Sequence, residues 1–243
     1  MLEFDRRTRA VLIAGAALFI SVGLGACAEM SQILQPQTGA AGSSNQSVLS
    51  RAVKESLELS STRAAELLSK TGGYQNNALY RIKLPEPVQP IAARLRQFGL
   101  GGQVDQIEKL MNQGAEHAAV EAKGVFISAV RSMTITDAMT IVRGNDTAAT
   151  DYFRQHTEAE LRQKYLPIIQ NNLRQVGFYT QYQQLLSAYK QLPLSNKPDL
   201  DLEQHVLTQS LKALFTQVGE EEKAIRKDPI GRGSSAIAAV FGR

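Results

Sequence analysis

The feature that most constrains the fold is the spacing of apolar residues, which is helical from Ser47 almost to the end of the chain. Apolar side chains recur three and four residues apart, as expected for helices that bury one face. Only residues 80–84 alternate as a strand would, and a single strand has no partner with which to form a sheet. We therefore predict one all-α domain over residues 47–243, an irregular bundle of about eight helices with residues 80–84 as an extended connector.

Residues that start and stop helices divide this pattern into segments. We expect Thr136 to cap a short helix, and Thr157 with Glu160 to form a capping box that opens a new one. Pro167 should kink that helix, and Asp201 should begin the last long helix. The predicted stops are Gly72-Gly73, Gly99, Gly144, Gly177 and Asp228-Pro229.

The N-terminus is built like an export signal. Three arginines within residues 6–9 precede an apolar run over residues 10–23, which is the order of a signal peptide. The run ends in Leu24-Gly25-Ala26-Cys27, which resembles a bacterial lipobox, in which the cysteine receives diacylglycerol and acyl chains such as palmitate. We predict that residues 1–26 are a cleaved signal peptide and that Cys27 is lipidated. The alternative is an uncleaved anchor, because residues 10–28 approach the ~20 residues that span a bilayer.

The residues after Cys27 favour a tether to the membrane. Cys27 is the only cysteine, so lipidation would leave no thiol for a disulfide. Residues 27–46 are rich in Ala, Gly, Ser, Gln and Thr, a composition typical of a flexible linker. Ala28 stands where an aspartate would signal inner-membrane retention in enterobacterial lipoproteins, so we expect an outer-membrane lipoprotein facing the periplasm. We expect no nucleic-acid partner, because no clustered Lys/Arg stripe is present.

Short motifs across the predicted domain resemble a known family. The chain is similar to the bacterial domain-of-unknown-function family DUF4197, exported proteins that often carry lipoprotein signals. The resemblance extends from about Ser47 to Phe241. Because no activity is assigned to the family, no catalytic residues can be carried over from it. The matching stretches are residues 69–74 (SKTGGY), 82–86 (IKLPE), 111–116 (MNQGAE), 148–153 (AATDYF), 192–194 (LPL), 197–202 (KPDLDL) and 220–226 (EEEKAIR).

One constellation could carry chemistry. Glu108, Asn112 and Glu116 recur at i, i+4 and i+8, so they share one helix face. Facing carboxylates in a helical bundle could bind a cation or act as acid and base. The alternative is a solvated face, or a buried polar network in which an arginine pairs with a carboxylate. The candidate polar site comprises Asn112, Glu116, Glu121, Glu221, Glu222 and Arg226.

Other reactive side chains give no motif. The three histidines, His117, His156 and His205, lack metal-binding spacing. No nucleophile motif is present, and residues 99–102 (GLGG) lack the lysine of a phosphate loop. We therefore expect no metal and no cofactor. The tyrosines over residues 179–189 could line an interface, although such stripes usually pack inside.

These observations favour a membrane-anchored periplasmic lipoprotein without catalytic activity. Its partner would be an envelope protein or a hydrophobic small ligand, in addition to the membrane itself. The alternative is an envelope hydrolase or transferase that uses carboxylates, and it predicts a pocket holding Glu116 with Glu221 or Glu222. A metal-binding helical domain is a third possibility, which the poor ligand set disfavours.

Overall fold

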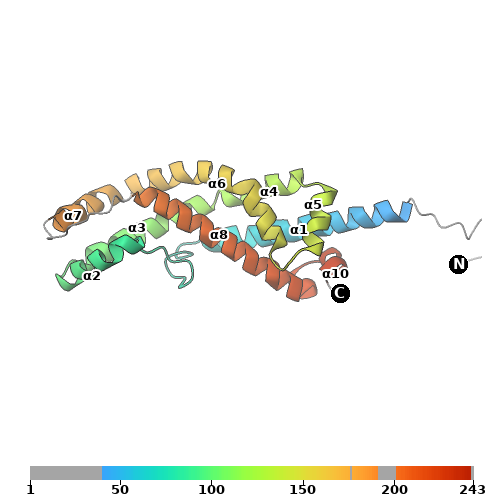
Figure 1. Ribbon diagram of the computed structural model, residues 1–243, viewed down its shortest axis with the longest axis horizontal. Coiled ribbons are helices and arrows are strands. Elements are labelled where there is room, and N and C mark those ends of the chain that lie inside the picture. The colour runs from blue at the N-terminus through green and yellow to red at the C-terminus, as the bar shows by residue number, and fades with distance from the viewer. Residues whose placement is uncertain (1–39, 176, 191–200, 242–243) are drawn as a thin grey trace, which may run out of the picture. The chain divides into compact units, whose positions relative to one another are not determined.

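A computed structural model describes residues 40–175, 177–190 and 201–241 of the chain (Figure 1). The predicted signal peptide, Cys27 and the greater part of the predicted tether lie outside the described residues, as do two of the stretches that resemble the family, 192–194 and most of 197–202.

The described residues form helices and contain no strand, so the all-α prediction is confirmed. The first helix begins at Ala40, which makes the last residues of the predicted tether helical. The segment predicted as a connector has no regular secondary structure over residues 81–85. The helices are α1 (Ala40–Leu68), η1 (Glu86–Val88), α2 (Gln89–Gln97), α3 (Gly101–Ala119), α4 (Ala122–Ser132), α5 (Ile135–Arg143), α6 (Ala148–Gln175), α7 (Phe178–Lys190), α8 (Leu202–Lys227), α9 (Pro229–Arg232) and α10 (Ser235–Phe241).

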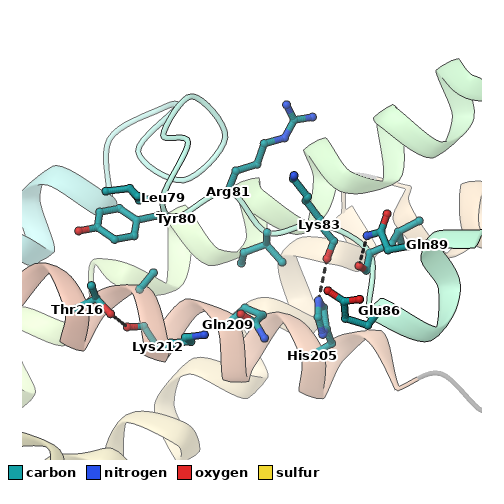
Figure 2. A pocket seen from close by; sticks show the side chains of 13 residues that line it. Leu79, Tyr80, Arg81, Lys83, Glu86, Gln89, His205, Gln209, Lys212 and Thr216 are labelled. Carbon is teal, nitrogen blue, oxygen red and sulfur yellow. Dashed lines mark hydrogen bonds between the residues drawn. The ribbon is translucent and has the colours of Figure 1, made fainter. Parts of the chain in front are cut away.

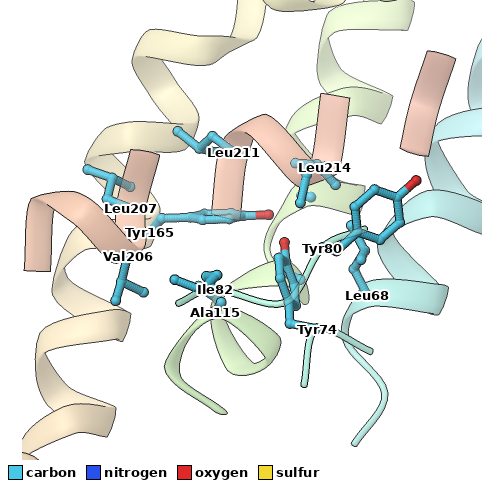
Figure 3. Packing of buried hydrophobic residues seen from close by; sticks show 14 of the residues in the cluster. Leu68, Tyr74, Tyr80, Ile82, Ala115, Tyr165, Val206, Leu207, Leu211 and Leu214 are labelled. Atoms are coloured by element: carbon cyan, nitrogen blue, oxygen red, sulfur yellow. The ribbon is translucent and has the colours of Figure 1, made fainter. Parts of the chain in front are cut away.

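The centre of the domain is the packing of α3, α6 and α8, each of which contacts the other two. Phe126 of α4 lies with its ring centroid 4.8 Å from that of Phe153 on α6 and 6.0 Å from that of Phe215 on α8. Tyr165 of α6 is buried next to leucines of α8 (Figure 3). Burial of these large side chains is what holds the helices together.

Helix ends agree with the prediction where a glycine or a capping side chain determines them. Gly72, Gly99 and Gly177 all have positive φ angles, the conformation in which glycine ends a helix most easily. The carboxylate of Asp201 accepts a hydrogen bond from Gln204 N at 3.0 Å and caps α8. α8 ends at Lys227, directly before Asp228-Pro229, as predicted.

Two predicted caps are wrong. α5 is capped by Thr134, whose capping box uses Asp137, rather than by Thr136. Thr157 opens no helix, because it lies inside α6, an unbroken helix of 28 residues. Its hydroxyl donates to Phe153 O at 2.6 Å, so a bond within the helix replaces the expected cap and Thr157 is buried.

Among the described residues, no single helix has the length and hydropathy of a membrane span. The segment Gly101–Ser132 (α3 and α4) reaches that length and hydropathy only together with α5, and the two segments are bent by 106° relative to each other.

Candidate functional site: the polar row and the connector groove

Glu108, Asn112 and Glu116 of α3, which we call the polar row, hold the connector (residues 74–85) against the helix. Glu116 is 4% exposed. One of its carboxylate oxygens accepts hydrogen bonds from Tyr74 N and Gln75 N, both at 3.2 Å. These backbone donors lie in a turn outside any helix, so the carboxylate supplies the acceptor that no helix partner provides.

Asn112 binds the connector in the same way. It is fully buried, and its side chain accepts from Ile82 N and donates to Ile82 O, each at 2.8 Å. Glu108 accepts from Leu84 N at 3.2 Å, and Arg81 lies 3.5 Å from its other oxygen. The row therefore serves as a hydrogen-bonding edge along which an extended segment lies, much as a neighbouring strand would.

Glu222 and Arg226 of α8 form a second buried group. Glu222 is 3% exposed and accepts hydrogen bonds from Ala149 N at 3.1 Å and Thr150 N at 2.9 Å. These are first-turn N–H groups of α6, which have no partner within their own helix. Arg226 pairs with Glu222 at 2.9 Å and donates to Ile141 O at 3.1 Å. The carboxylate thus caps α6 from a neighbouring helix.

The structure does not bring the predicted polar site together. No hydrogen bond or ion pair between described residues joins Glu116 to Glu222 or Arg226. Glu221 accepts from Gln217 of its own helix at 3.1 Å and lies 3.8 Å from Arg232. Glu121 is exposed at the break between α3 and α4. Neither Glu116 nor Glu222 lines any of four open cavities between described residues, which lie beside the connector, α3, α5 and α7.

Tyr74 and Tyr165 lie in the core near Ile82 and Ala115 (Figure 3). Burial raises the pKa of Tyr74, and the neighbouring Glu116 carboxylate raises it further. The Tyr74 hydroxyl donates to Ser210 O at 3.0 Å. Burial also raises the pKa of Tyr165 well above its usual value, and its hydroxyl has no hydrogen-bond partner among the described residues. Both phenols are therefore neutral parts of the core.

The histidines serve separate structural contacts. His117 contacts Asn172, and exposed His156 stacks on Tyr152. His205 of α8 lies 2.8 Å from Lys83 O, and because a carbonyl can only accept, His205 Nε2 is the donor. The described part of the chain contains no group of three His, Cys, Asp or Glu side chains placed to hold a metal ion.

A cavity of about 530 Å³ lies between the connector and α8 (Figure 2), and we call it the connector groove. Polar side chains of α8 line one wall, and the connector lines the other. Figure 2 shows Arg81 and Lys83 extending from the side of the connector away from α8, where they also border a second hollow. The wall consists of Leu79, Tyr80, Arg81, Ile82, Lys83, Leu84, Glu86, Gln89, His205, Gln209, Lys212, Ala213 and Thr216.

Sequence reasoning missed this groove. Its α8 wall has a signal, since His205, Gln209, Lys212 and Thr216 recur at i, i+4, i+7 and i+11, a polar stripe on one helix face. The opposite wall lies more than a hundred residues earlier in the chain, so no local pattern could join the two.

The fold and site together define an all-α domain with buried structural carboxylates and a separate, solvent-open polar groove. The chain belongs to DUF4197, a family of proteins of unknown function, whose sequence model matches residues 43–242. No curated protein and no solved structure matches the chain.

Proposed function

We propose that this protein is a non-catalytic binding protein, anchored to the bacterial outer membrane through lipidated Cys27 and facing the periplasm. Its ligand or partner occupies the connector groove. The proposal rests on the difference between the buried carboxylates and the polar side chains of the groove. Buried carboxylates bind the protein's own backbone, whereas the groove presents Gln209 and Lys212, whose side chains bond to no other described residue.

The bonding of the carboxylates disfavours the alternative of a hydrolase or transferase. A general acid or base must reach the proton that it transfers. Glu116 and Glu222 are 4% and 3% exposed, and backbone N–H groups occupy them both. Glu222 is also paired with Arg226.

The groove supports a polar ligand rather than a hydrophobic one. Its α8 wall carries Gln209, Lys212 and Thr216, and Glu86 and Gln89 also line the groove. Apolar ligands bind in pockets lined mainly by apolar and aromatic groups. An envelope molecule with anionic or hydrogen-bonding groups fits this wall better.

The anchor rests on the lipobox-like residues 24–27 and on the family resemblance. Labelling of growing cells with radioactive palmitate should label the wild-type protein and leave the Cys27→Ser variant unlabelled. Equal labelling of both proteins would contradict lipidation at Cys27.

Site-specific crosslinking in cells tests the groove. A photoreactive amino acid at Gln209 should give a discrete adduct, because this side chain lines the groove. The same amino acid at Lys227, exposed at the end of α8, is the matched control. The Lys212→Gln change should weaken the Gln209 adduct. Identical adducts from both positions, insensitive to Lys212, would overturn the proposed site.

A further inference from the structure

We propose that the connector groove binds the phosphate group of a polar phosphate ester, such as a glycerol phosphate. This assignment rests on the binding function proposed above and names the chemistry of the ligand. The same group could come from a phospholipid headgroup at the membrane surface or from a soluble molecule.

The α8 wall offers positive charge and hydrogen-bond donors that the fold leaves unused. Lys212 is exposed, and its ammonium makes no ion pair with any residue in the described ranges. Gln209 lies one helical turn before it and is half-buried. Figure 2 shows Gln209 and Lys212 on the side of α8 that faces the connector. An ammonium and an amide side by side suit a phosphate oxygen, because charge-assisted hydrogen bonds are the strong ones.

The connector wall adds a backbone donor. Asn112 binds both the N–H and the C=O of Ile82, which shows that the two groups of one residue point the same way in this extended segment. The next residue therefore directs both groups to the opposite side. Lys83 O indeed meets His205 on α8, so Lys83 N–H also faces the groove. Within the described residues, no acceptor is bonded to this N–H.

The Lys212 ammonium and the size of the groove agree with a phosphate ester. Lys212 places a positive charge on the α8 wall, against one negative charge from Glu86, whereas Arg81, which pairs with Glu108, and Lys83 extend from the far side of the connector. Phosphate is recognised mainly by cationic side chains and backbone N–H groups. A cavity of about 530 Å³ is larger than a phosphate ion needs, which leaves room for the alcohol part of an ester.

Calorimetric titration of the full chain in a nonionic detergent tests the assignment. The probes are inorganic phosphate, glycerol 1-phosphate and dihexanoylphosphatidylglycerol, with glycerol and dihexanoylglycerol as phosphate-free controls. We expect the phosphate-bearing probes to bind and the controls not to bind. Preference for glycerol 1-phosphate would indicate a soluble ligand, and preference for the short-chain phospholipid would indicate a headgroup.

Variants show whether the binding is in the groove. Lys212→Gln should weaken it about tenfold, since one charge-assisted hydrogen bond is lost. Gln209→Glu, which adds a negative charge to the same wall, should abolish it. The control Lys227→Gln lies on the same helix, about 22 Å further along, and should change affinity less than about twofold because it is remote from the wall. Circular dichroism verifies that each variant is folded.

Absence of binding to every phosphate-bearing probe would overturn the phosphate assignment, as would equal effects of Lys212→Gln and Lys227→Gln. If the position-specific adduct at Gln209 persisted in that case, the proposed binding function would stand and only its ligand class would fall. If neither phosphate binding nor the Gln209 adduct were observed, the groove would not be a binding site.

Discussion

Replacing Asn112 should detach the connector from α3. The side chain is fully buried and bonds Ile82 N, Ile82 O and Glu108 O at 2.8, 2.8 and 2.7 Å. Asn112→Ala leaves the two buried groups of Ile82 without partners. Each unsatisfied group costs about 1–3 kcal/mol, and water entering the vacated space recovers part of this. We expect a loss of about 3 kcal/mol in the free energy of unfolding.

Asn112→Asp is a sharper version of the same test. The new side chain still accepts from Ile82 N, but when ionised it can no longer donate to Ile82 O. A buried charge facing carbonyl oxygens should raise the pKa of the introduced carboxyl, and its protonated form restores the donor. A raised folded-state pKa means that stability is lost as pH rises through that pKa. The variant should therefore recover stability relative to wild type as pH falls below that raised pKa, and the recovery should be complete near the unfolded Asp pKa of about 4.

Urea unfolding of the full chain, followed by circular dichroism, measures both effects. Asn76→Asp is the matched control, because Asn76 is an exposed turn residue near the start of the connector and should change stability by less than about 0.5 kcal/mol. A similarly small effect of both Asn112 variants would refute the claim that the polar row holds the connector.

Further predictions concern other buried groups. Tyr74→Phe should cost about 1 kcal/mol because it removes the hydrogen bond to Ser210 O, whereas Tyr165→Phe should be neutral or stabilising because that hydroxyl has no partner among the described residues; urea unfolding compares them. Burial raises the pKa of both phenols, so their contribution to stability is present below the unfolded pKa of about 10 and is lost as pH rises above it. Urea midpoints measured across that range should fall less steeply in Tyr165→Phe than in wild type. Glu222→Ala should cost about 3–5 kcal/mol, since it leaves Arg226 unpaired and two N–H groups of α6 unsatisfied; an unchanged thermal midpoint would contradict this capping role. Gly72→Ala should cost about 1–2 kcal/mol, because φ is +84° and that region is unfavourable for alanine; a loss below about 0.3 kcal/mol would argue against it.

The fold was predictable where its causes are local. Gly99 and Asp201 end and begin helices through their own backbone or side-chain chemistry, so the sequence alone placed those boundaries. Thr157 shows the limit, because its motif is that of a cap, yet continuous packing on both sides keeps α6 helical through it.

The site was predictable only in part. The spacing of Glu108, Asn112 and Glu116 correctly placed them on one face, but it did not reveal that this face would bind backbone groups of residues 74–84. The groove depends on His205 meeting Lys83 across 122 residues, a pairing that tertiary packing alone decides.

The division between structural carboxylates and a binding groove is tested most directly by one comparison. Calorimetry should measure glycerol 1-phosphate binding to Lys212→Gln and to Glu222→Gln at a temperature where both variants are folded. We predict affinity about tenfold weaker for Lys212→Gln, since one charge-assisted bond is lost, and unchanged for Glu222→Gln. Unchanged binding in Lys212→Gln together with lost binding in Glu222→Gln would contradict the account.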